Sequence, residues 1–408
     1  MKISPLNLSA TIGDVLMIRL SKSVIGQKEK EAVLCVLDKE YLGMGAEVQQ
    51  FEDALTEFFG RPAVCVNTGT AALHLAIQAC GIGSGDEVLV PSLTYVASFQ
   101  AISATGARAV ACDIDPQTLT LDWRDAEQRL TSRTKAVMPV HYAGGVGSLE
   151  GIYSFAHKNN LRVIEDAAHA IGTVHRGQLV GSFGDIACFS FDGIKNFTSG
   201  EGGCIVTTDE KILQLVRDAR LLGVEKDTEQ RYAGTRSWEF QVHNQGWRYH
   251  MSNIMAAIGL VQLERFPEFA KKRQALARQY DEHLKGDPNI SLIQHDYTNV
   301  VPHIYVIRIT GLQNREKLRA SLLAQGIQTG VHYQPNHWLM YFKEDNAGIL
   351  PVFDATYHEL LSLPLHPDLN NEDIEFVCDR LISYLDEQKC YGRVSPSGPN
   401  FIRNKFYE

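Results

Sequence analysis

The sequence of 408 residues lacks several features that would assign it to a class at once. No apolar run reaches the roughly 18 residues of a membrane-spanning helix, so we expect no membrane span. Lysine and arginine form no basic block and the net charge is −9, which argues against nucleic acid as a partner. The N-terminal segment lacks the clean apolar core of a secretory signal, and we therefore expect a cytoplasmic protein.

Cysteine is present, but without close pairs. The 8 cysteines stand singly and form neither a CxxC motif nor a Cys/His cluster at metal-ligand spacing, so no metal site is predicted. Several lie inside apolar runs, as Cys65 and Cys188 do, where cysteine behaves as a small buried hydrophobe. This usage is typical of a reduced protein.

Short apolar runs alternate with helical stretches from about residue 60 onward. The runs that predict strands are 63–67, 86–91, 107–114, 135–142, 161–168, 185–191 and 202–209. Continuous β-branched runs favour strands buried on both faces of a mainly parallel sheet, and the alternation predicts an α/β/α layered domain. The first strand is not followed by GxGxxG, which counts against a Rossmann dehydrogenase.

The C-terminal part of the chain predicts a second, smaller α+β domain. A long helical region begins near Asn253, followed by a strand at 303–309 and helices at 315–326 and 372–388. We expect an N-terminal extension (1–18), a large cofactor-binding domain (19–265), a small domain (266–388) and a tail (389–408).

Lys195 stands in surroundings that are unusual for a lysine. It follows a buried strand in FSFDGIKNFTSGEGG, with Ser190 before it and several glycines after it. Burying an ammonium group is costly, whereas a lysine that attaches to a carbonyl cofactor needs partial desolvation to become nucleophilic. The alternative is an ordinary surface lysine in a glycine-rich loop.

Asp166 ends another predicted strand, in RVIEDAAHAIGT. Open α/β sheets bind ligands at this end of their strands, and a carboxylate there can keep a pyridinium nitrogen protonated. The alternative for Asp166 is a helix N-cap. His169, three residues on, can face the same cavity, or it can be an ordinary core histidine.

Two further strand ends carry candidate ligand-binding residues. In VNTGTAALHLA, Gly69 and Thr70 stand where backbone N–H groups at a helix start can bind phosphate, although a plain capping turn has the same sequence. Tyr95 follows the next strand and can stack on a flat heterocycle, or it can be a half-buried aromatic residue. The order of phosphate turn, aromatic, aspartate, serine and lysine, each at a strand end, favours one shared site.

The chain resembles the DegT-type sugar aminotransferases, a branch of the fold-type I pyridoxal 5′-phosphate (PLP) enzymes, from about Arg19 to Glu387. The motifs are GMGAEVQQFEDAL, NTGTAALHLA, GDEVLVPSLTYVAS, KAVMPVHYAG, VIEDAAHAIGT, FSFDGIKNFTSGEGG and MSNIMAAIGLVQLERF. The resemblance implies that Lys195 carries the cofactor and moves the proton. It also implies that the cofactor is held by Asp166 at the pyridine nitrogen, His169 near the ring hydroxyl, Tyr95 on the ring, and Gly69, Thr70 and Ser190 at the phosphate.

The resemblance further implies a homodimer with active sites at the interface, where a partner residue completes the phosphate site. In GWRYHMSN, many relatives have Asn where Arg248 stands and Arg where His250 stands. Arg248 is expected to reach the phosphate through a charge-assisted contact.

The segment GVHYQPNHW resembles the family segment that approaches the sugar, so the candidate substrate residues are His332, Tyr333 and His337. Structural histidines in a packing loop are the alternative.

The implied reaction moves an amino group from L-glutamate to a nucleotide-linked keto-deoxyhexose, a 3- or 4-keto-6-deoxy sugar. Such products enter the O-antigen of lipopolysaccharide or capsule. A keto-cyclitol such as an inosose is the nearest alternative acceptor. A regulatory protein that binds the cofactor without turnover is a rival of another class, and exchange of an amino group with a donor would separate the two.

Overall fold

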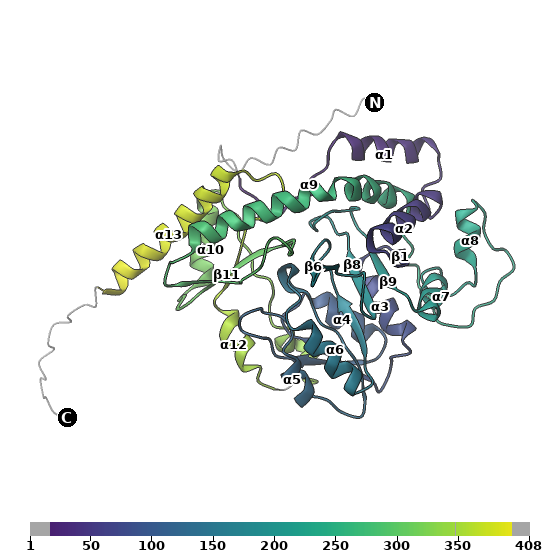
Figure 1. Cartoon of the computed structure of the whole chain (residues 1–408), viewed down its shortest axis with the longest axis horizontal. Helices are drawn as coiled ribbons and strands as arrows, with labels where there is room; N and C mark the ends of the chain where they lie inside the picture. Colours follow the sequence, from purple (N-terminus) through teal and green to yellow (C-terminus); the bar gives the residue numbers. More distant parts are fainter. Residues whose placement is uncertain (1–16, 347, 394–408) are drawn as a thin grey trace, which may run out of the picture.

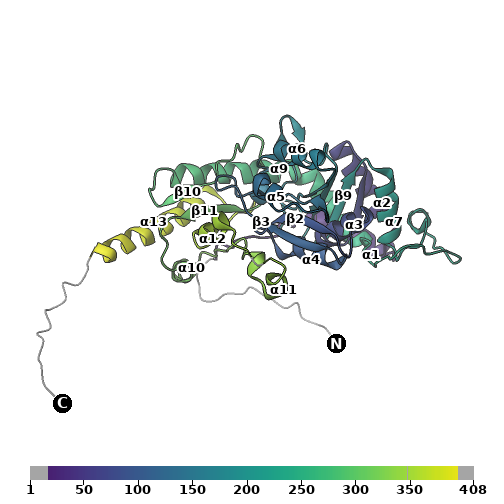
Figure 2. The same cartoon turned by 90° about the horizontal axis from the view of Figure 1, so that it is seen from below.

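The computed structural model describes residues 17–346 and 348–393, so most of the predicted N-terminal extension and tail lie outside it. Two bodies are joined along the long helix α9 (Asn253–Leu284), as Figures 1 and 2 show from two directions. No helix in the described ranges is both long and apolar enough to cross a membrane.

A seven-stranded sheet forms the centre of the larger body, in the order β1-β9-β8-β5-β4-β2-β3. Each predicted strand of this domain corresponds to one observed strand: β1 (Ala63–Val66), β2 (Glu87–Pro91), β3 (Arg108–Cys112), β4 (Thr134–Val137), β5 (Arg162–Asp166), β8 (Ile186–Ser190) and β9 (Gly203–Thr207). Only β9 is antiparallel to its neighbours β1 and β8 in this sheet. The predicted α/β class and mainly parallel sheet are confirmed.

Helices cover both faces of this sheet because successive strand side chains alternate between two apolar cores. Val64 and Val66 belong to the core under α3 (Gly69–Ala79), α4 (Val96–Ala104) and α7 (Glu210–Ala219). Cys65 belongs to the opposite core, under α2 (Ala46–Phe59) and the start of α9. The helices α5 (Trp123–Gln128) and α6 (Leu149–Lys158) extend that second layer. Outside these layers are α1 (Gln27–Asp38) and α8 (Asp227–Tyr232).

The smaller body is built on an antiparallel sheet of β10 (Ile290–Leu292), β11 (Tyr305–Ile309) and β12 (Leu360–Leu363). Its core is closed by α10 (Arg315–Ala324), α13 (Asn371–Arg393) and the second half of α9. The remaining short elements are β6 (Val174–His175), β7 (Gln178–Leu179), η1 (Tyr142–Gly144), η2 (Asn336–Trp338), α11 (Met340–Lys343) and α12 (Pro351–Tyr357).

Two boundaries lie differently from the sequence-based expectation. Helix α9 continues through Pro267, so the boundary proposed at 265–266 falls inside a helix that serves both bodies. Helix α13 runs to Arg393, past residue 389 where the tail was expected to begin.

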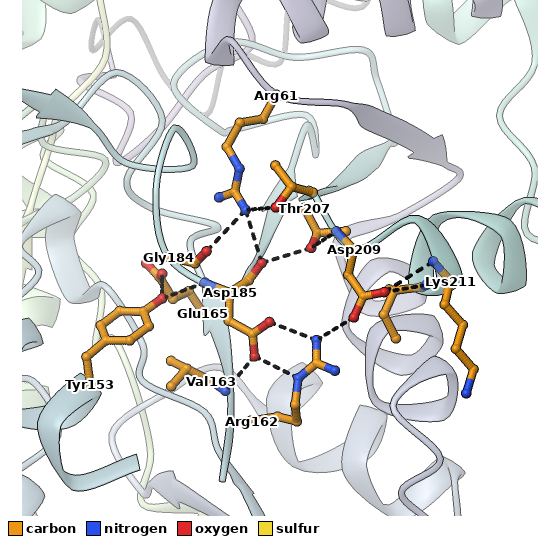
Figure 3. A network of polar contacts seen from close by, with 12 residues as sticks. Arg61, Tyr153, Arg162, Val163, Glu165, Gly184, Asp185, Thr207, Asp209 and Lys211 are labelled. Atoms are coloured by element: carbon orange, nitrogen blue, oxygen red, sulfur yellow. Dashed lines mark hydrogen bonds and ion pairs between the residues drawn. The ribbon is translucent and has the colours of Figure 1, made fainter. Parts of the chain in front are cut away.

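The amino ends of β5 and β8 are tied together by polar contacts (Figure 3). The Asp185 carboxylate accepts two hydrogen bonds from the Arg162 guanidinium, at 2.7 and 2.8 Å, and one from the N–H of Val163 at 3.1 Å. The N–H of Asp185 donates to Tyr153 Oη at 3.0 Å, and the Tyr153 hydroxyl donates to Glu165 Oε1 at 2.5 Å. These contacts fix the alignment of two strands whose opposite ends carry Asp166 and Ser190.

Candidate active site

A cavity of about 500 Å³ opens at the carboxyl ends of β1, β5 and β8. The parallel strands β5 and β8 bring residues distant in sequence to this edge. Nine of the predicted site residues line the cavity: Gly69, Thr70, Tyr95, Asp166, His169, Ser190, Lys195, His332 and Tyr333.

Lys195 lies in the loop after β8, partly buried at the cavity. Burial lowers the pKa of its amine to about 8, because the ammonium form loses hydration; Asp166 and Asp192 oppose this shift, and Arg273 adds to it. The Lys195 Nζ lies 3.4 Å from Nε2 of His303. These are the surroundings of a nucleophilic lysine, not of a solvated surface lysine.

Asp166 is buried at the end of β5. Its Oδ2 accepts a hydrogen bond from Ser98 Oγ at 2.7 Å, and its Oδ1 accepts one from the N–H of Ala168 at 3.2 Å. The contact with Ala168 is a local turn, of the kind expected if Asp166 were only a capping residue. The same side chain also lines the cavity, so the carboxylate is fixed in place beside it.

The start of α3 and the end of β8 form a cradle suited to an anion. Thr68 caps the helix by accepting a hydrogen bond from the N–H of Ala71 at 3.0 Å. A Cβ atom on Gly69 would lie 2.7 Å from Cβ of Ser190, so only glycine allows this close approach. The first N–H groups of a helix have no intrahelical acceptors, and with Ser190 Oγ they offer donors to a phosphate.

Aromatic and imidazole rings form another wall of the cavity. The ring of Tyr95 lies 5.5 Å from that of Tyr333, and the Tyr333 hydroxyl is 3.1 Å from Nε2 of His169. The Nδ1 atom of His169 is buried without a hydrogen-bond partner in the described structure. His332 Nδ1 is 2.7 Å from Ser362 Oγ, which orients that ring.

Two predicted residues lie outside the cavity. Arg248 is exposed, and its backbone pairs with Leu221. His337 is buried, with Nδ1 2.7 Å from Ser92 Oγ and Nε2 3.0 Å from Asp354 Oδ1. Both of its ring nitrogens are therefore occupied, as the structural alternative for this histidine expects.

Ser98 and His303 were not predicted, yet they contact the two central groups of the site. Ser98 lies on α4 and His303 precedes β11, both in apolar segments. Ser98 ends the motif GDEVLVPSLTYVAS, from which only Tyr95 is predicted as a site residue, and no quoted motif includes His303. Each contact depends on how a distant element packs against the cavity.

These groups fit pyridoxal phosphate. The strand-end carboxylate suits a pyridinium nitrogen, the cradle suits a phosphate, and the amine of Lys195 suits an aldehyde. The buried, unpartnered Nδ1 of His169 leaves a polar atom available near the same space. Fold and site together define a PLP-dependent enzyme of the α/β class.

The model of the DegT/DnrJ/EryC1/StrS aminotransferase family matches residues 23–382. The chain therefore belongs to this family, whose aminotransferases use PLP. The predicted family, enzyme class and cofactor are confirmed.

Individual relatives agree with this assignment. The spore coat polysaccharide biosynthesis protein SpsC of Bacillus subtilis (strain 168) is 36% identical over 368 residues, which cover 88% of this chain and 95% of SpsC. The aminotransferase TlmJ of Streptoalloteichus hindustanus is 31% identical with a TM-score of 0.84, covering 91% of this chain and 100% of TlmJ. The putative sugar aminotransferase Spr1654 of Streptococcus pneumoniae, in its PMP form, is 29% identical with a TM-score of 0.86. The match covers 92% of this chain and 100% of Spr1654.

Proposed function

We propose that this aminotransferase transfers an amino group from L-glutamate to the ketone of a nucleotide-linked 6-deoxy sugar, at C3 or C4. A sugar acceptor is supported by the relatives: SpsC acts in spore coat polysaccharide biosynthesis, and Spr1654 is described as a putative sugar aminotransferase. The product would serve a surface polysaccharide such as O-antigen or capsule.

One observation carries the catalytic part of the proposal. A single cavity holds a lysine amine of lowered pKa, a fixed strand-end carboxylate and a phosphate cradle. Each group alone has an ordinary structural explanation, but the three together match the amine, charge and anchoring needs of one cofactor.

When bound, PLP supplies an electron sink for the carbon that gains or loses the amino group. Lys195 would move the proton: its neutral Nζ would accept the proton that leaves the substrate carbon and hold it for return. A pKa of about 8 leaves both forms of the amine accessible near neutral pH. Asp166 would hold a proton on the pyridine nitrogen, while Ser190 and the start of α3 would anchor the phosphate.

The acceptor would enter past the aromatic wall. Tyr95, His332 and Tyr333 line the cavity and offer flat surfaces and hydrogen-bonding groups to a sugar ring. His337 is not included in this proposal, since its ring nitrogens bind Ser92 and Asp354.

The test is the near-visible absorption spectrum of the purified protein with PLP, before and after addition of L-glutamate. We expect the band of the lysine-bound cofactor to decrease and that of pyridoxamine phosphate to grow. A keto-sugar nucleotide should then restore the first band, and the choice of nucleotide and keto position would follow from a panel.

Lys195→Ala is the control variant, because it removes the amine and leaves the phosphate cradle intact. It should show no lysine-bound band and no exchange. A wild-type spectrum that L-glutamate leaves unchanged would refute this donor, and a protein that gives no band with added PLP would refute the assignment of the site.

We also propose that the active enzyme is a homodimer in which Arg248 completes the phosphate site of the partner. The exposed position of Arg248, outside the cavity of its own chain, supports a role across an interface. Lys195 is the only Lys or Arg among the cavity-lining residues of the described chain, so a further cation near the phosphate would come from elsewhere.

A further inference from the structure

His303 places an imidazole from the smaller body against the reactive lysine of the larger one. It stands two residues before β11 and is 3% exposed. Its Nε2 lies 3.4 Å from Nζ of Lys195, and its other ring nitrogen, Nδ1, has no hydrogen-bond partner in the described structure. Within the described residues, the amine of Lys195 is therefore the single hydrogen-bond partner of this ring.

The backbones that carry both side chains are held by one buried guanidinium. Nη1 of Arg273, on α9, donates to the carbonyl oxygen of His303 at 3.0 Å, and Nη2 donates to that of Lys195 at 3.5 Å. Arg273 thus links the two backbone segments from which the imidazole and the amine extend.

The other polar groups near the amine have partners of their own. Both oxygens of Asp166 accept hydrogen bonds, from Ser98 and Ala168. Nε2 of His169 is paired with the Tyr333 hydroxyl, and Nδ1 of His332 with Ser362. His303 differs from them, because the ring nitrogen that makes its one hydrogen bond within the described residues, Nε2, faces Lys195.

The imidazole is neutral, which suits this contact. Burial lowers the pKa of His303 well below its ordinary value, and the charge of Lys195 acts in the same direction. With its proton on Nδ1, the neutral imidazole accepts a hydrogen bond from the lysine amine at Nε2, whereas an imidazolium would repel the protonated lysine.

We propose that His303 is a positioning residue for Lys195, whose imidazole holds the ε-amino group by one hydrogen bond and aims it at the reacting carbon. This inference rests on the proposed role of Lys195 as the cofactor lysine. The imidazole would matter most whenever the amine is released from the cofactor and must return to it.

The test compares His303→Phe, which keeps a ring without a hydrogen-bonding atom, with His303→Gln, which keeps a hydrogen-bonding group. The control is His295→Phe: His295 is a half-buried histidine that also has an unpartnered ring nitrogen, but it packs against Tyr297 and does not line the cavity. The readout is the rate at which the lysine amine of the apo-protein condenses with the aldehyde of added PLP, releasing water, as a function of pH.

We expect His303→Phe to slow this attachment by about tenfold or more, since a misdirected nucleophile reacts slowly. The midpoint of its pH profile should move to lower pH, because the ammonium form loses an acceptor. The other charged or titratable groups that face the amine stay in place: Asp166, His169, Asp192, Arg273 and His332. His303→Gln should recover most of the rate, and His295→Phe should match the wild type.

A second measurement leaves His303 unchanged. In apo-protein labelled with ¹⁵N-histidine, Lys195→Met should move the Nε2 resonance of His303, assigned by its loss in His303→Gln. An unchanged resonance, or a wild-type attachment rate and pH midpoint in a folded His303→Phe protein, would overturn the inference. Failure of wild-type protein to attach PLP would instead count against the proposed function, and the resonance would still report on the contact.

Discussion

At the scale of single residues, the chemistry of the site depends on how far Lys195 is removed from water. Its amine has a pKa of about 8, below the ordinary value of 10.5, because burial disfavours the charged form. We predict that PLP attachment to the apo-protein accelerates as pH rises through about 8 and then levels off. Stopped-flow absorbance over a pH series measures this profile, and a rate still rising toward pH 10.5 would indicate a solvated lysine.

Residues at strand ends could be predicted from the sequence, whereas residues that act through packing could not. Asp166, Ser190 and Lys195 follow buried apolar runs, and parallel strands bring such ends to one edge. Ser98 and His303 reach the site from a helix and from the smaller body. Ser98 ends a quoted motif, but neither that position nor the sequence around His303 indicates which group the side chain contacts.

At the scale of secondary-structure elements, the phosphate cradle depends on the fit between α3 and β8. In Gly69→Ala, the added Cβ would lie 2.7 Å from Cβ of Ser190, so the helix start or the strand end must shift. We predict that PLP binds roughly 10 to 100 times more weakly, because anchoring groups tolerate little displacement. Equilibrium titration of the apo-protein measures this affinity.

Gly348→Ala is the matched control for this substitution. Gly348 is exposed, and the nearest atom to its added Cβ would be 3.9 Å away, an ordinary van der Waals distance. Its affinity for PLP should equal that of the wild type. Equal affinity in Gly69→Ala would mean that the phosphate is held elsewhere.

The amino ends of β5 and β8, which lie away from the cavity, stabilise the fold and take no part in the reaction. Asp185→Asn would remove the charge that binds Arg162 through two hydrogen bonds (Figure 3). We predict a loss of about 1–3 kcal/mol in the free energy of unfolding, the usual cost of losing charged hydrogen bonds. Urea unfolding of the apo-protein measures it.

An exposed ion pair provides the comparison for Asp185. Glu127 pairs with Lys158 at 2.9 Å, and both side chains are exposed. Glu127→Gln should cost at most about 1 kcal/mol, as exposed pairs do. If both substitutions lower the free energy of unfolding equally, the network at the amino ends of β5 and β8 contributes no more stability than an exposed ion pair does.

At the scale of the whole molecule, the proposed dimer predicts that two inactive variants can complement each other, which a monomeric enzyme could not do. Lys195→Ala and Arg248→Ala chains, each impaired alone, should regain activity when mixed subunits form. Random association makes half of the dimers mixed, each with one complete site, so about a quarter of wild-type activity is expected. Turnover of co-refolded chains measures it, and no recovery would show that Arg248 acts within its own chain or not at all.

The division of the chain into bodies was only partly accessible from the sequence. The sequence predicts a smaller α+β domain around one strand at 303–309, but not the three-stranded antiparallel sheet that this strand forms with β10 and β12. Nor does it predict the path of α9 through Pro267, because proline normally predicts a break, and here packing of Phe266 and Phe269 on one core and Tyr280 on the other holds the helix together.

The continuous helix α9 also limits how this molecule can be divided in evolution. Its first half completes the core of the larger body and its second half that of the smaller one, so neither body keeps a closed core without it. Lys195 precedes α9 and His303 follows it, so any recombination event within 253–284 would separate Arg273 from one of the two backbones that it joins. The two bodies are therefore expected to be inherited as one unit, with substrate range diversifying through loops at the cavity instead of by exchange of whole domains.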